Sequence, residues 1–106
     1  MKRYGLVYKV KKESLKDYEK AHAEIWPEMN EAIAAAGFRN YSIFAAEQGM
    51  LFAYLEHNDL KEGLEELYKT EISRKWQQYM ENFFEKQESD KEGPEYIYLK
   101  EIYHLD

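Results

Sequence analysis

Hydrophobic and polar residues alternate at both ends of the chain, which is the pattern of a β-strand with two distinct faces. In residues 2–10 one face carries Tyr4, Leu6, Tyr8 and Val10. In residues 95–105 apolar side chains occupy both faces. Two further strands are predicted over residues 40–46 and 50–56, and the connection Glu47-Gln48-Gly49 between them predicts a hairpin.

Between these strands the apolar residues recur every three or four positions, which is the period of an amphipathic helix. Ser14 and Asp17 form a capping-box pattern, so the first helix is predicted to begin at Leu15. Pro27 lacks a backbone donor and predicts a kink or a division at that point. Gly37 predicts the end of this helical region.

A second helical region follows the hairpin. Asp59 and Glu62 repeat the capping pattern, and another apolar stripe begins after Thr70. Residues 86–95 are charged and contain Gly93-Pro94, which predicts an exposed loop. The order βαββαβ predicts an α+β, ferredoxin-like fold with a four-stranded antiparallel sheet, in a single domain over residues 1–106.

Helices can cover only one face of such a sheet, yet the strands are largely apolar on both faces. The uncovered face is predicted to pack against the sheet of a second copy. The sequence therefore predicts a symmetric homodimer in the form of a dimeric α+β barrel.

Composition excludes several classes of protein. The 106 residues include 15 Lys and Arg against 21 Asp and Glu, for a net charge of −6, and no basic run long enough for a nucleic-acid-binding patch. Cysteine is absent, which excludes disulfides and thiol catalysis. No apolar run approaches the length of a membrane span, so we expect a cytoplasmic protein with no membrane partner. Ten tyrosines suit an interface or a pocket for a polar ligand.

The main candidate for chemistry is His22. Tyr18, His22 and Trp26 follow one another at intervals of four residues and share one face of the predicted helix. Imidazole titrates near neutral pH and can donate or accept a proton there. The alternative for a lone histidine is a core position with a satisfied hydrogen bond. Either Trp26 or Trp76 can be core, or can offer a flat apolar face to a sugar ring.

The remaining candidate residues are one tyrosine and two histidines. Tyr41 begins the second strand, where it can meet His22 across a cleft. His57 and His104 stand at strand ends and are expected at the surface. The histidines are too scattered for a metal site. No glycine-rich phosphate loop, nucleophile elbow or distinct carboxylate pair is found.

Several motifs together resemble a known family. They are His22, Ile25-Trp26-Pro27-Glu28, Gly37, Asn40-Tyr41-Ser42-Ile43, Leu51-Phe52-Ala53, Arg74-Lys75-Trp76 and Tyr79-Met80. In this order, and over nearly the whole chain, they resemble the L-rhamnose mutarotase family. Each element is weak alone, whereas the set is specific.

The resemblance implies a dimeric ferredoxin-like enzyme that interconverts the α and β anomers of L-rhamnopyranose in rhamnose catabolism, with no cofactor or metal. It implies that His22 is the proton donor and that Tyr18, Tyr41 and Trp76 surround the sugar. Family members often have a second tryptophan where this chain has Gln77, so an amide replaces a stacking surface in the sugar site.

Two other functions remain open from the residues themselves. Similar dimeric barrels host small monooxygenases and haem-degrading proteins, although a shared fold is only an analogy. A non-catalytic sugar- or ligand-binding dimeric module, with His22 in the core, is the third possibility. In that case the protein would bind sugar without accelerating anomer exchange.

Overall fold

The computed structural model describes residues 1–84 and 95–106, and in these ranges the predicted fold is confirmed. The strands are β1 (Lys2–Lys9), β2 (Arg39–Ala45), β3 (Met50–His57) and β4 (Ile97–Leu99). The helices are α1 (Leu15–Ala23), α2 (Pro27–Ala35), α3 (Leu60–Tyr68) and α4 (Glu71–Met80), with short 3₁₀ turns η1 (Lys12–Ser14) and η2 (Glu81–Phe83).

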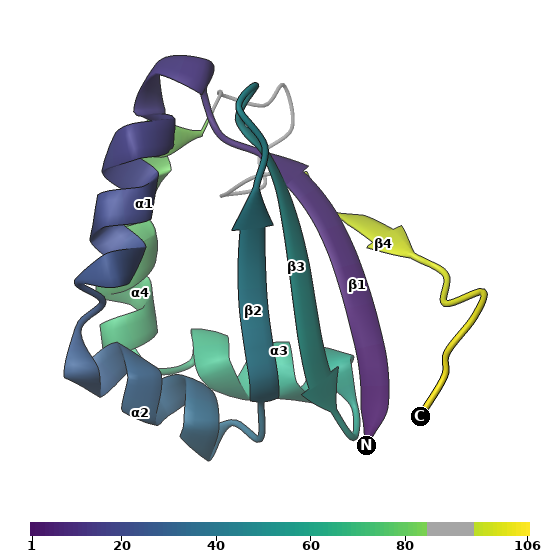
Figure 1. Cartoon of the computed structure of the whole chain (residues 1–106). Helices are drawn as coiled ribbons and strands as arrows, with labels where there is room; N and C mark the ends of the chain where they lie inside the picture. Colours follow the sequence, from purple (N-terminus) through teal and green to yellow (C-terminus); the bar gives the residue numbers. More distant parts are fainter. Residues whose placement is uncertain (85–94) are drawn as a thin grey trace.

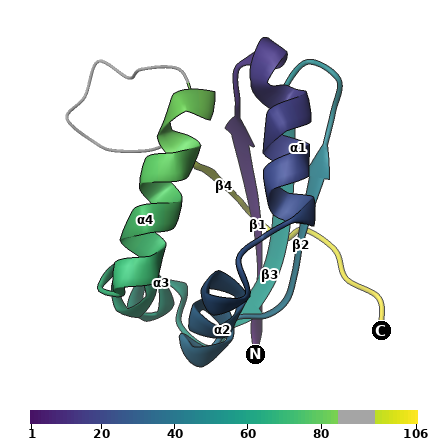
Figure 2. The same ribbon diagram turned by 90° about the vertical axis from the view of Figure 1, so that its left-hand side faces the viewer.

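The four strands form one antiparallel sheet in the order β2-β3-β1-β4, with the helices on one side of it (Figure 1). Seen from the helical side, α1 and α4 stand in front of the sheet, and α2 and α3 lie near its lower end (Figure 2). This arrangement gives the sheet an inner face toward the helices and an outer face away from them.

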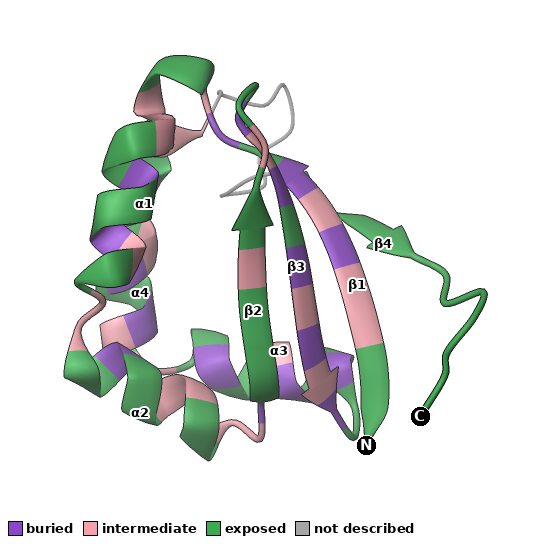
Figure 3. Ribbon diagram, in the orientation of Figure 1, coloured by how far each residue is buried: buried purple, intermediate pink, exposed green. Residues whose placement is uncertain are grey.

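The inner face is the hydrophobic core. Buried residues alternate along β1 and β3, as the period of a strand requires (Figure 3). Leu51 and Leu55 on β3 are 0% and 2% exposed, and Leu6 lies opposite Ala53 across the β1–β3 ladder. The core therefore forms between this face and the apolar sides of the helices.

The predicted helix ends are largely confirmed. α1 ends before Pro27, which is the first residue of α2, where its missing N–H removes no helical hydrogen bond. Gly37 follows α2 with φ of 95°, a conformation that favours glycine. Asp59 and Thr70 cap α3 and α4, accepting hydrogen bonds from the backbone N–H groups of Glu62 and Ser73.

Two local predictions are wrong. α1 begins at Leu15 as predicted, but the Ser14 side chain makes no cap hydrogen bond. Ser14 belongs to η1, which runs directly into α1 and bonds the Ser14 N–H to the carbonyl of Lys11. The last strand is also shorter than predicted and pairs with β1 only through residues 97–99. Alternating apolar and polar residues indicate that a segment has two faces. A segment becomes a strand only where a neighbouring strand is available for backbone hydrogen bonds. The predicted loop over residues 86–95 lies almost wholly outside the described residues.

The expectation that His57 lies at the surface is also wrong, since it is only 7% exposed. It ends β3 on the inner face. Its Nδ1 accepts a hydrogen bond from the Asp59 N–H at 2.8 Å, and its Nε2 donates to the Ala36 carbonyl at 2.6 Å. The ring fits there because Gly37 and Gly63 face it without side chains. His104 lies in the exposed segment after β4, as expected.

Candidate active site

Helices α1 and α4 bring three of the predicted site residues together. Tyr18 and His22 are one turn apart on α1, with ring centroids 4.2 Å apart. Trp76 of α4 meets His22 edge-on, at 5.3 Å and 80°. The short distances place an imidazole, a phenol and an indole in one cluster between the two helices.

Among the described residues, the hydrogen bonding of His22 leaves one ring nitrogen without a partner. Its Nδ1 lies 2.9 Å from the carbonyl oxygen of Tyr18, and a carbonyl can only accept, so Nδ1 carries a proton. Nε2 is then the atom that gives or takes a proton in any reaction. Burial lowers the pKa of His22, and the hydrogen bond to the Tyr18 carbonyl opposes this effect. His22 therefore meets the chemical requirement for an acid–base group.

A second tyrosine lies directly behind Tyr18. The hydroxyl of Tyr8, on the inner face of β1, is 2.8 Å from the Tyr18 hydroxyl, and both side chains are buried. Burial raises the pKa of each phenol above its usual value near 10. Both hydroxyls therefore stay protonated at neutral pH and act as neutral hydrogen-bonding groups.

Tyr41 lies on β2, an edge strand of the sheet. Burial, with a smaller contribution from Tyr68, raises its pKa to about 12, although 41% of the residue is exposed. Both observations fit an edge strand, on which the backbone faces solvent and the hydroxyl end points inward. The phenol of Tyr41 also contributes to the raised pKa values of Tyr8 and Tyr18, so its hydroxyl faces the same interior. Its nearest ring contact is Phe38, at 6.3 Å, and not His22.

Gln77 follows Trp76 on α4 and is half-buried. Its amide nitrogen is 3.5 Å from the Ser73 hydroxyl, which is the long limit for a hydrogen bond. The amide is therefore weakly held, and its donors and acceptor can serve a ligand.

Trp26 packs against the cluster through Trp76 and Tyr79. Its carbonyl accepts hydrogen bonds from the N–H groups of Met29 and Asn30, at the start of α2. Its indole stacks on Tyr79 at 5.6 Å and 9° and meets Trp76 edge-on at 5.1 Å. These contacts fix the break between α1 and α2 and hold Trp76 in place.

Sequence reasoning did not identify Tyr8, Tyr96, Phe83 and Phe84 as parts of this region. Tyr8 packs on Tyr96 at 5.0 Å, and Phe83 and Phe84 contact the ring of Tyr18 edge-on. The available signal was the number of tyrosines, together with the place of Tyr8 on the inner face of β1. Neither observation shows which residue it meets.

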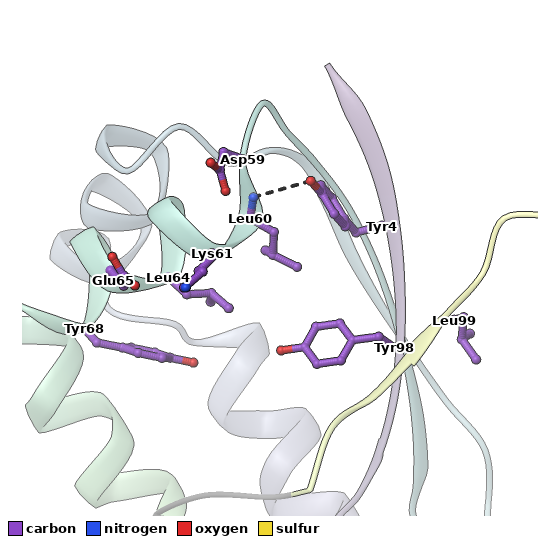
Figure 4. Close-up of a pocket in the computed structure, with 9 residues that line it drawn as sticks. All are labelled: Tyr4, Asp59, Leu60, Lys61, Leu64, Glu65, Tyr68, Tyr98 and Leu99. Atoms are coloured by element: carbon purple, nitrogen blue, oxygen red, sulfur yellow. Dashed lines mark hydrogen bonds between the residues drawn. The ribbon is translucent and has the colours of Figure 1, made fainter.

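The structure also contains a cavity that none of the five predicted site residues lines (Figure 4). It has a volume of about 660 Å³ and lies between α3, β1 and β4. Figure 4 shows Tyr68 of α3 and Tyr98 of β4 pointing toward one another across it. The chemistry of the His22 cluster, and not the size of this cavity, therefore identifies the candidate site.

Two negative findings apply to residues 1–84 and 95–106. In this part of the chain no group of three or more His, Asp or Glu side chains is placed to hold a metal ion. No helix there is long and apolar enough to cross a membrane.

Comparison with known proteins decides the family. The L-rhamnose mutarotase family model matches residues 3–105. The chain belongs to the L-rhamnose mutarotase family. Proteins named L-rhamnose mutarotase from Lactiplantibacillus plantarum and Bacillus subtilis are each 40% identical to it over 100% of both chains. The one from Shouchella clausii is 42% identical over 99% of both chains.

Solved structures agree with the family and the fold. The crystal structure of an L-rhamnose mutarotase from Formosa agariphila is 27% identical, with a TM-score of 0.81 over 100% of both chains. A dimeric ferredoxin-like protein from an uncultured marine organism has a TM-score of 0.58 at 14% identity, covering 98% of this chain and 96% of its own. This second likeness concerns the fold alone.

Proposed function

We propose that this member of the family is an L-rhamnose mutarotase, an isomerase that interconverts the α and β anomers of L-rhamnopyranose. The observation that carries the proposal is the arrangement of His22, whose Nδ1 is tied to the backbone and whose Nε2 is available beside Tyr18 and Trp76. The comparisons give no support to a non-catalytic ligand-binding module. Action in cytoplasmic rhamnose catabolism belongs to the same proposal and rests on family membership.

Each site residue has a role in the proposal. His22 is the catalytic proton donor. Trp76 offers an apolar indole face to the sugar ring, as indoles do in carbohydrate sites. Tyr18, Tyr41 and Gln77 bind sugar oxygens through hydroxyl and amide groups. The phenols suit this role because their raised pKa values keep them neutral donors.

The chemistry is a ring opening followed by a ring closure. His22 protonates the ring oxygen through Nε2 while the anomeric hydroxyl gives its proton to water, the bond between the anomeric carbon and the ring oxygen breaks, and an aldehyde forms. The aldehyde turns about its bond to the next carbon. The hydroxyl that was the ring oxygen then attacks the other face of the aldehyde and returns its proton to Nε2, while the aldehyde oxygen takes a proton from water and becomes the new anomeric hydroxyl. A positioned general acid typically contributes about 10²–10⁴-fold to such a step.

Exchange spectroscopy tests this function directly. In NMR, L-rhamnose at equilibrium gives separate anomeric proton signals, and the enzyme should transfer magnetisation between them faster than buffer does. His22→Ala should lower the rate by about 10²–10⁴-fold. His104→Ala is the matched control, because this histidine lies in the exposed segment after β4. Exchange no faster than in buffer contradicts the function, and an unaffected His22→Ala variant contradicts the assigned acid.

The proposal includes a homodimer formed through the outer face of the sheet. One cross-strand row on this face consists of Phe44, Phe52, Val7 and Ile97, in register on four adjacent strands. Three of these residues are strongly exposed, with Phe44 at 63%, Phe52 at 42% and Ile97 at 58%. An apolar row of this kind is typical of a surface that packs against another protein. An ion pair between Arg3 and Glu101, at 2.8 Å, lies at one end of the same face.

The oligomeric state tests the dimer. Phe52→Lys places a charge in the middle of the apolar row and should convert a dimer to a monomer in sedimentation experiments. Ala34→Lys is the control, because Ala34 is exposed on α2, on the other side of the sheet. A monomeric wild-type protein, or an unaffected Phe52→Lys dimer, contradicts this interface.

A further inference from the structure

Tyr8 and Tyr18 form an isolated pair of buried hydroxyl groups. Their oxygens are 2.8 Å apart, and each residue is 5% exposed. Tyr8 projects from β1, an interior strand of the sheet, whereas Tyr18 projects from α1 beside His22. The pair therefore connects the rigid sheet to the helix that carries the proposed acid.

The pair contains two hydroxyl protons and one hydrogen bond, so one proton is left for another acceptor. Within residues 1–84 and 95–106 each of the two hydroxyls has the other as its one hydrogen-bond partner. The ring of Tyr8 is packed against Tyr96 at 5.0 Å and Phe84 at 6.4 Å. The remaining proton is best placed on Tyr18, because this residue lies next to His22, where a ligand can accept it.

We propose that Tyr8 is a positioning residue: its hydroxyl donates to the Tyr18 oxygen, so that Tyr18 in turn donates its own proton to an oxygen of the bound sugar. This inference deepens the proposed function and rests on it. Tyr8 does not touch substrate and acts only through Tyr18. Because the donor direction of Tyr18 is fixed, the oxygen that it binds must be an acceptor, such as a sugar hydroxyl or the ring oxygen.

Burial raises the pKa of both phenols, so both hydroxyls keep their protons at neutral pH. Either oxygen of the pair can therefore donate to the other. The direction proposed here is the one that leaves the Tyr18 proton, beside His22, for the sugar.

A double-mutant cycle separates positioning from packing. Tyr8→Phe keeps the ring and removes only the hydroxyl, and it should lower kcat/KM for anomer exchange about two- to twelvefold, the usual range for one neutral hydrogen bond. The loss should fall mainly on KM, since Tyr18 binds the sugar before and during ring opening. In a Tyr18→Phe background, Tyr8→Phe should have no further effect.

Tyr4→Phe is the matched control. Tyr4 lies on the same strand and the same face, but its hydroxyl accepts a bond from the Leu60 N–H at 3.4 Å, away from Tyr18. It should leave kcat/KM unchanged. A Tyr8→Phe variant with wild-type kcat/KM, or one whose loss persists in the Tyr18→Phe background, overturns the inference.

A spectroscopic measurement reads the hydrogen bond without turnover. The ¹³Cζ resonance of Tyr18, in protein labelled at tyrosine, should shift in Tyr8→Phe and stay in place in Tyr4→Phe. An unmoved resonance in Tyr8→Phe also overturns the inference. If the wild-type protein shows no anomer exchange, the proposed function fails instead, and the resonance still decides whether the Tyr8 hydroxyl is bonded to Tyr18.

Discussion

Replacing Gly63 by alanine should destabilise the protein, although the same change in an ordinary helix does the opposite. Gly63 lies inside α3 and is buried against the ring of His57. A Cβ at this position would contact Nε2 of that ring and would lie 2.8 Å from Cε1 and 2.9 Å from Cδ2. Real Cβ atoms do not approach other atoms this closely, so the ring or the helix must move.

The ring is not free to move, because two hydrogen bonds hold it. Its Nε2 donates to the Ala36 carbonyl at 2.6 Å, and its Nδ1 accepts from the Asp59 N–H at 2.8 Å. Turning the ring away breaks both, at about 0.5–1.5 kcal/mol each, and leaves buried polar groups without partners. Keeping the ring in place means overpacking, which typically costs about 1–3 kcal/mol.

The opposing effect is helix propensity. Alanine is favoured over glycine inside a helix by about 0.8–1.0 kcal/mol. Either structural response costs as much or more, so the free energy of unfolding should fall by up to about 2 kcal/mol net. Urea unfolding followed by circular dichroism measures this change. Protein concentration must be held constant, because the proposed dimer would add to the apparent stability.

The cycle with His57→Ala isolates the cause. Without the imidazole, the Cβ at position 63 has room, and Gly63→Ala should become neutral or stabilising by up to about 1 kcal/mol. If Gly63→Ala raises the free energy of unfolding in the wild-type background, the packing argument is refuted. A loss of equal size with and without His57 would mean that the clash lies elsewhere.

Three further predictions concern the site and the helix caps. If His22 is the proton donor, kcat/KM corrected for buffer catalysis should rise as the pH falls toward the pKa of His22, because only the protonated ring can donate. Burial holds this pKa below the usual value near 6.5. A rate that falls on acidification would contradict the role. Thr70→Ala removes the cap of α4 and should lower the free energy of unfolding by about 1 kcal/mol in urea titrations, whereas an unchanged midpoint would show that the cap contributes nothing. Gln77→Ala should raise KM for L-rhamnose about two- to twelvefold if the amide binds sugar, and an unchanged KM removes Gln77 from the site.

The sequence predicted most of the fold because the relevant signals are local. Strand alternation, the division of the helix at Pro27 and the cap at Asp59 each depend on only a few residues. The errors arose where distant parts of the chain decide. The burial of His57 depends on Gly37 and Gly63, which the fold places against it. The length of β4 depends on what β1 offers for pairing.

The candidate site divides in the same way. Tyr18 and His22 could be joined from their spacing, because both lie on α1. The contact of His22 with Trp76 depends on how α4 packs against α1, and the resemblance to the family supplied it before the geometry did. The pairing of Tyr8 with Tyr18 spans strand and helix, and no periodicity reports which of ten tyrosines meet.

In the proposed mechanism, the protonation states of the site assign the ring-oxygen proton to one histidine. Burial raises the pKa values of Tyr8, Tyr18 and Tyr41, so these phenols remain donors throughout. His22 is then the group in this cluster of described residues that changes protonation near neutral pH. Closing the ring on the second face is the reverse of an opening step. Microscopic reversibility therefore requires the imidazole that protonated the ring oxygen to take that proton back. In this mechanism His22 carries the same charge after a full interconversion as before it, and the proton on the anomeric oxygen is exchanged with water.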